Sequence, residues 1–139
     1  MISNRDQNDY ELVGIGIDIF RVQRILDTIK KDKKILRRIF TENELLSAQK
    51  SERQAEQLAS FFSGKEAVFK ALRLSWADKI KWTDIEIVKK ESGLPRVNLK
   101  NRARDIAINK GVGKILLSLS HETDYAVAVC VAIRFNQRA

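Results

Sequence analysis

The stretch AEQLASFFSGKEAVFKAL, residues 55–72, decides the fold because its apolar residues recur with helical spacing over five turns. At about 100° per residue they gather into one stripe. The stripe consists of Leu58, Phe61, Phe62, Val68, Phe69 and Leu72. Lys65 falls in the middle of it, whereas Glu66 and Lys70 lie together on its flank. We therefore expect a long helix with one buried face and one polar edge.

Two segments far from this helix have the small side chains that close packing needs. Residues 12–20 alternate branched apolar residues with Gly14, Gly16 and Asp18, which predicts a strand with one nearly bare face. Residues 125–133 alternate as well, and one face of that strand carries only alanines and Cys130. A helix can approach such faces closely.

The remaining segments predict two hairpins and several helices. Residues 83–88 and 96–99 flank a turn at 92–95, and residues 115–120 precede 125–133 across a turn at 121–124. Helices are expected over 21–40 (either one helix or two with a joint), from a capping box at Thr41 and Glu44, and over 101–110. We expect an α+β fold in which a mainly antiparallel sheet packs against the long helix.

The length of 139 residues fits one domain, expected over 12–139 after a polar leader at 1–11. No segment approaches the about 20 apolar residues of a membrane span, and no apolar signal core is visible, so we expect a soluble cytoplasmic protein without a membrane partner. Cys130 is expected to be a small core residue. One cysteine and one histidine are too few for a zinc site.

Basic residues are concentrated in one region. The chain has 26 Lys and Arg against 18 acidic residues, a net charge of +8, and residues 21–40 alone contribute +6. Such a patch suits nucleic acid, an anionic membrane or an acidic ligand. The segment lacks exposed aromatic residues that could stack on bases and matches no nucleic-acid-binding motif, which disfavours a nucleic-acid partner.

Asp18, Glu66 and Lys70 are the candidate site residues. Two carboxylates from a strand and a helix, with a lysine one turn away, could hold magnesium and a polyphosphate. The alternative for Glu66 and Lys70 is an ordinary surface pair. Lys65 either covers the core with its stem while its ammonium reaches water, or meets an anion in a cleft. A lone histidine such as His121 is more often structural.

Six motifs in order resemble the holo-acyl-carrier-protein synthase family of 4′-phosphopantetheinyl transferases. They are Gly14-Ile15-Gly16-Ile17-Asp18-Ile19 with Arg24-Ile25, Phe40-Thr41-Glu42-Asn43-Glu44-Leu45, Lys65-Glu66-Ala67-Val68-Phe69-Lys70-Ala71, Trp82-Thr83-Asp84-Ile85-Glu86-Ile87, Gly93-Leu94-Pro95, and Ser118-Leu119-Ser120-His121 with Tyr125-Ala126. The resemblance extends over residues 12–133.

The resemblance implies transfer of phosphopantetheine from coenzyme A to a serine of an apo acyl carrier protein, with release of 3′,5′-ADP. By this likeness Asp18 and Glu66 would hold Mg²⁺, and Lys70 would steady or protonate the leaving phosphate. Lys65 would contact a coenzyme A phosphate, and His121 would lie near the nucleotide phosphates.

The resemblance also implies partners. The family docks its acidic carrier protein on the first helix, for which Arg24 is the leading candidate, supported by Arg21, Lys31, Lys34 and Arg38. Members of this small type are homotrimers with active sites at subunit interfaces.

Three positions depart from the family pattern. Phe61 stands where the family commonly has arginine, and Leu94 replaces a lysine of the turn. Residues 73–77 replace a glycine-rich loop that would help to hold coenzyme A phosphates, and Arg73 would substitute as a phosphate contact. The altered loop leaves an alternative function open: a carrier-binding paralogue with weak or no transferase activity.

Overall fold

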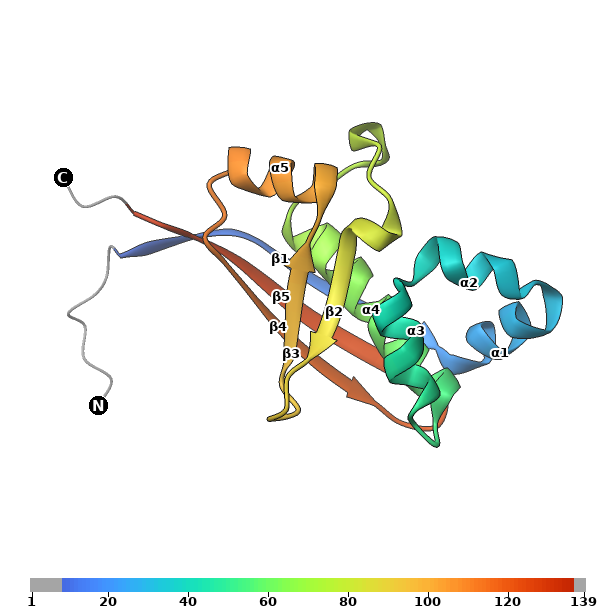
Figure 1. The fold of residues 1–139 in the computed structure, drawn as a ribbon. Helices are drawn as coiled ribbons and strands as arrows, with labels where there is room; N and C mark the ends of the chain where they lie inside the picture. The colour runs from blue at the N-terminus through green and yellow to red at the C-terminus, as the bar shows by residue number, and fades with distance from the viewer. Residues whose placement is uncertain (1–8, 137–139) are drawn as a thin grey trace, which may run out of the picture.

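The computed structural model describes residues 9–136, in which a twisted three-stranded sheet carries a long helix on one face (Figure 1). The sheet has the order β1 (Tyr10–Arg21), β5 (Tyr125–Phe135) and β4 (Lys114–His121), with antiparallel neighbours. Strand β1 begins two residues earlier than the strand predicted over 12–20. Residues 1–8 of the leader lie outside the described part.

Helix α4 (Gln54–Ala71) packs against β1 and β5 as the small residues predict. The alanines of β5 that face it, together with Cys130, are fully buried. On β1, an added Cβ at Gly14 would lie 2.1 Å from the carbonyl oxygen of Ala71, and one at Gly16 would lie 1.9 Å from that of Ala67. The strand and the helix therefore meet backbone to backbone.

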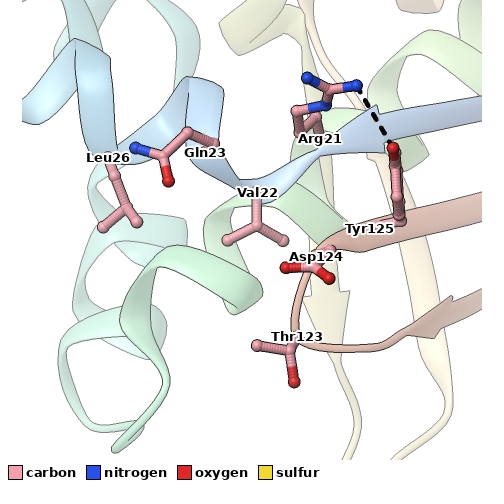
Figure 2. Close-up of a pocket in the computed structure, with 7 residues that line it drawn as sticks. All are labelled: Arg21, Val22, Gln23, Leu26, Thr123, Asp124 and Tyr125. Atoms are coloured by element: carbon pink, nitrogen blue, oxygen red, sulfur yellow. Dashed lines mark hydrogen bonds between the residues drawn. The ribbon is translucent and has the colours of Figure 1, made fainter.

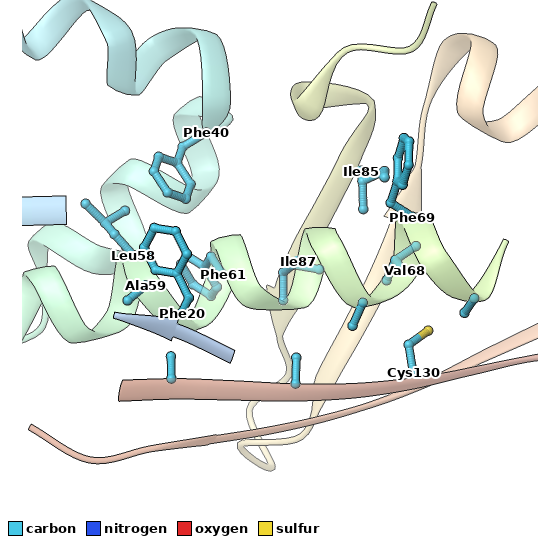
Figure 3. Packing of buried hydrophobic residues seen from close by; sticks show 14 of the residues in the cluster. Phe20, Phe40, Leu58, Ala59, Phe61, Val68, Phe69, Ile85, Ile87 and Cys130 are labelled. Carbon is cyan, nitrogen blue, oxygen red and sulfur yellow. The ribbon is translucent and has the colours of Figure 1, made fainter. Parts of the chain in front are cut away.

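The opposite side of α4 is covered by a second layer, whose apolar side chains Figure 3 shows above the helix. Phe61 and Ile85 are fully buried there, and Phe40 is 1% exposed. This layer contains the two-stranded sheet β2 (Ile85–Lys89) and β3 (Pro95–Leu99), with α5 (Asn101–Asn109) following it. Strand β2 starts two residues later than predicted because residues 82–84 form a 3₁₀ turn.

Three short helices connect β1 to α4. Helices α1 (Val22–Lys31) and α2 (Lys33–Ile39) are separate, so residues 21–40 form two helices with a joint rather than one helix. Asp32 forms the joint, and its carboxylate accepts a hydrogen bond from the Lys34 amide at 2.9 Å. Helix α3 (Glu42–Gln49) begins at the predicted capping box.

Within residues 9–136, no helix combines the length and the hydropathy needed to cross a membrane.

We expect Gly16→Ala to lower the free energy of unfolding by about 3 kcal/mol, because the new methyl group would overlap a helix carbonyl that cannot move without displacing α4. Gly64→Ala is the matched control. Its methyl would lie 3.3 Å from a Leu119 side-chain atom that can yield, and alanine favours the helix, so we expect a change within about 1 kcal/mol. Urea unfolding followed by circular dichroism measures both, and equal stability of the two variants would contradict the argument.

Candidate active site

Asp18 and Lys70 meet where β1 passes α4. Asp18 pairs with Ala128 of β5, and its carboxylate lies toward α4 because the alternation of β1 puts it on the glycine-bearing face. The Lys70 ammonium lies 3.7 Å from Asp18 Oδ1 and donates a hydrogen bond to the Ile17 carbonyl at 2.9 Å. The Lys70 side chain is 50% exposed, so its ammonium is also open to a ligand.

The second carboxylate oxygen of Asp18 is buried and accepts no hydrogen bond from any described residue. Burial raises the pKa of Asp18, an effect that the Ser63 hydroxyl, Lys70 and Arg24 offset only in part. Burial also raises the pKa of Glu66, and the negative charge of Asp18 raises it further. Two carboxylates thus share a partly desolvated site whose protein cations neutralise them incompletely. Such a pair could hold a divalent cation.

The predicted triad of Asp18, Glu66 and Lys70 is therefore brought together on one flank of α4. The pair of Glu66 and Lys70 is not an isolated surface pair, since both side chains lie beside Asp18 of a different element.

Lys65 does not reach this site, and the expectation that it contacts a coenzyme A phosphate is wrong. Its ammonium is fully buried and lies 2.7 Å from Glu44 Oε1. It also donates to the carbonyls of Trp82, at 3.0 Å, and Ile85. An ammonium has three protons, and all three have acceptors inside the protein. The anion that Lys65 meets is a core carboxylate.

Glu44 is the residue that sequence reasoning missed. It completes the capping box by accepting from the Thr41 amide at 2.8 Å, and the same carboxylate accepts from the Ile87 amide at 2.9 Å. The capping pattern explained Glu44 sufficiently at the sequence level. The signal that could have pointed to Glu44 is Lys65 itself, because a lysine on the apolar stripe of a helix needs a buried anionic partner.

His121 lies at the end of β4, apart from the triad. Its Nδ1 is 3.4 Å from Glu56 Oε2, at the start of α4. Asp18 lies on β1, and β5 separates the two strands. Within one chain, His121 and Asp18 therefore do not form one site.

Arg73 follows the C-terminal end of α4, with a left-handed backbone (φ 56°) and an exposed side chain. The Lys110 ammonium donates to the carbonyls of Leu72, at 2.7 Å, and Arg73, at 3.0 Å, which ties down the start of the loop.

The predicted docking residues lie on the surface formed by the end of β1, α1 and α2. Figure 2 shows Arg21 donating to the Tyr125 hydroxyl, at 3.3 Å, beside a pocket of about 400 Å³ that Gln23 and Leu26 also line. The Arg24 guanidinium lies over the Phe20 ring, 4.7 Å from its centroid. Lys31, Lys34 and Arg38 are exposed.

The structure shows the surroundings of two residues that depart from the family pattern. Phe61 is fully buried in the core, where an arginine would bring a charge. Leu94 is 64% exposed at the β2–β3 turn.

Comparison with known proteins gives a consistent picture. Residues 14–130 match the sequence profile of the 4′-phosphopantetheinyl transferase superfamily. A holo-[acyl-carrier-protein] synthase from Caldanaerobacter subterraneus subsp. tengcongensis is 43% identical over 121 residues, 87% of this chain and 94% of that protein. Plasmodium yoelii acyl carrier protein synthase with ADP bound superposes with a TM-score of 0.82 at 28% identity, covering 93% of this chain and 100% of that one. The Bacillus anthracis holo-(acyl-carrier-protein) synthase in complex with CoA (3′,5′-ADP) gives 0.72 at 32% identity, covering 88% and 97%.

We expect Lys65→Met to lower the free energy of unfolding by about 3–5 kcal/mol, because it leaves the Glu44 carboxylate buried without its cation. The double variant Glu44→Gln with Lys65→Met should cost less than the sum of the single changes, since no buried charge remains. Urea unfolding measures this double-mutant cycle. A Lys65→Met protein of unchanged stability that had lost affinity for coenzyme A would restore the phosphate-contact role.

Proposed function

The chain belongs to the holo-[acyl-carrier-protein] synthase family of the 4′-phosphopantetheinyl transferase superfamily, and we propose that it transfers 4′-phosphopantetheine from coenzyme A to a serine of an apo acyl carrier protein, releasing 3′,5′-ADP. The observation that carries this proposal is the meeting of Asp18, Glu66 and Lys70 beside α4. The alternative, a carrier-binding paralogue without activity, would not need that arrangement to be intact.

Asp18 and Glu66 would hold Mg²⁺. The fit rests on the buried Asp18 oxygen without a hydrogen-bond donor and on two neighbouring carboxylates whose pKa values are both raised. Among the described residues no cluster of three or more His, Cys, Asp or Glu side chains could cage a metal alone. Magnesium commonly takes one or two carboxylates and completes its shell with water and substrate phosphates. When bound, it would neutralise charge on the pyrophosphate and polarise the bond that breaks.

The residues of the chain position the reacting groups around that site. The serine oxygen of the carrier forms a bond to the β-phosphorus of coenzyme A and gives up its proton to solvent, and the bond from that phosphorus to the bridging oxygen breaks. The electron pair and the bridging oxygen leave with 3′,5′-ADP. Lys70 can turn its half-exposed ammonium from the Ile17 carbonyl to the leaving phosphate, where its positive charge counters the charge that develops.

The carrier would dock on α1 and α2, with Arg24 as the leading contact and Arg21, Lys31, Lys34 and Arg38 in support. Arg24 lies at the border between this basic surface and the site, since its charge also favours the ionised forms of Asp18 and Glu66. A basic surface next to the reacting groups would steer an acidic carrier toward them and make the encounter sensitive to salt.

A homotrimer would cover the outer face of the sheet. Ile15, Ile17 and Ile19 of β1 are 63–70% exposed, and Val129 of β5 and Leu116 of β4 are partly uncovered on the same sheet. A continuous apolar strand face of this kind is typical of a subunit interface. An interfacial active site would also explain why His121 lies apart from Asp18 within one chain, because a neighbouring copy could supply it.

Intact-mass measurement of an apo acyl carrier protein incubated with this protein, coenzyme A and Mg²⁺ should show the addition of one phosphopantetheine, and EDTA should prevent it. Asp18→Asn and Glu66→Gln should each lower the rate by at least about 100-fold, since each removes one anionic ligand from the metal site. Asp105→Asn, on the far helix α5 with its side chain 67% exposed, is the matched control and should keep full activity. Full activity in Asp18→Asn would show that the metal site is misassigned, and no addition by the wild-type protein would favour the inactive paralogue.

Light scattering should give a mass of three times the 15.9 kDa chain. Ile15→Asp should yield monomers, because it places a charge in the apolar face, whereas Ile108→Asp, at a site on α5 that is 63% exposed, should leave the mass unchanged. A monomeric wild-type protein at assay concentration would refute the trimer.

A further inference from the structure

A buried serine of α4 contacts the strand at the residue that we assign to the metal. Gly16 of β1 lies against the carbonyl of Ala67 on the helix. Two residues later on β1 and one turn earlier on α4, the Ser63 hydroxyl donates a hydrogen bond to the carbonyl oxygen of Asp18 at 3.1 Å. Ser63 is fully buried. Helix and strand are therefore joined by a hydrogen bond at Asp18, where the glycines that allow backbone contact have ended.

Two side chains of α4 hold the two peptide groups that flank the Cα of Asp18. The Lys70 ammonium donates to the carbonyl of Ile17, which belongs to the peptide group before Asp18. The Ser63 hydroxyl donates to the carbonyl of the peptide group after it. Strand β1 lies at the edge of the described sheet, so strand pairing restrains it from one side only. Because the peptide groups are planar, fixing both of them fixes the direction in which the Asp18 side chain leaves the strand.

Ser63 also lies on the side of α4 that carries the rest of the candidate site. At about 100° per residue, it is about 60° from Glu66 and about 20° from Lys70 around the helix axis. One carboxylate of the pair comes from the strand and the other from the helix, so their separation depends on how firmly the two elements are joined at this level. Magnesium tolerates little variation in its coordination geometry and is sensitive to that separation.

The two hydrogen bonds differ in what a substrate can do to them. In the proposed transfer the Lys70 ammonium turns from the Ile17 carbonyl to the leaving phosphate, and its bond to the strand is then lost. The Lys70 side chain is 50% exposed, whereas Ser63 is fully buried and out of reach of a ligand. Among the hydrogen bonds of the described residues, that of Ser63 is the one from an α4 side chain that still holds Asp18 at this stage.

We propose that Ser63 is a positioning residue, whose hydroxyl keeps the Asp18 carboxylate at the distance from Glu66 that a divalent cation requires while Lys70 is engaged by the substrate phosphate. This inference rests on the proposed transferase function. Ser63 touches neither the substrate nor the cation, so its loss should lower the affinity for the cation and leave the rate at saturating cation unchanged.

Ser60 offers a matched control on the same helix. It lies one turn before Ser63, is 2% exposed, and its hydroxyl oxygen has no hydrogen-bond partner among the described residues. Ser60→Ala and Ser63→Ala therefore remove the same buried group from the same helix, but only Ser63→Ala removes a bond to Asp18. Alanine favours a helix more than serine does, so both variants should fold.

Titration with Mn²⁺, followed by electron paramagnetic resonance, measures the metal site without turnover, since Mn²⁺ accepts the same oxygen ligands as Mg²⁺. With coenzyme A present and no carrier, Ser63→Ala should weaken Mn²⁺ binding by about tenfold, and Ser60→Ala by less than about twofold. In the carrier modification assay, Ser63→Ala should raise the Mg²⁺ concentration for half-maximal rate by a similar factor without changing the rate at saturation.

Equal Mn²⁺ affinity of the wild-type protein and Ser63→Ala would overturn the inference. So would an equal loss in Ser60→Ala, or a lower saturating rate with an unchanged Mg²⁺ requirement. If Ser63→Ala fails to fold, Ser63→Cys keeps a side chain of similar shape whose thiol is a weak donor, and it should weaken Mn²⁺ binding in the same way. A wild-type protein that neither binds Mn²⁺ nor modifies a carrier would instead remove the proposed function itself.

Discussion

The buried ion pair between Lys65 and Glu44 is the interaction on which the rest of the structure depends. Burial lowers the pKa of the lysine and raises that of the glutamate, because desolvation outweighs their mutual attraction. The surrounding hydrogen bonds, to the carbonyl of Trp82 and from the amide of Ile87, compensate the charges and are directional. They connect α3, α4, β2 and the turn at Trp82 in one arrangement.

The elements of the fold could largely be predicted from periodicity and small residues. Gly14 and Gly16 predicted a strand face that a helix could approach closely, and the alanines of β5 predicted that this face continues on the next strand. The joint near Asp32 was left open between one helix and two, because a solvated run of charges fits either until the cap at Asp32 is seen. The late start of β2 follows from a 3₁₀ turn that alternation does not reveal.

The candidate site was predictable only where its residues share a local pattern or a family motif. Asp18, Glu66 and Lys70 met both conditions. The partner of Lys65 did not, since Glu44 lies 21 positions earlier and already had a local explanation as a capping residue. The ring contacts of Trp82 with Phe62 and Trp76 were also missed, because these residues come from separate segments and only the tertiary fold brings them into contact.

Alternate residues of strand β1 have different roles, so the two faces of the strand should differ in how readily they accept substitutions. Gly14 and Gly16 set the separation between β1 and α4, and with it the distance between Asp18 on the strand and Glu66 on the helix. The isoleucines between them face away from α4, so their side chains are constrained only by the surface that covers the outer face of the sheet. Substitutions in this strand should therefore be tolerated at every second position. The assembly surface could change during evolution while the spacing of the reactive groups stayed the same.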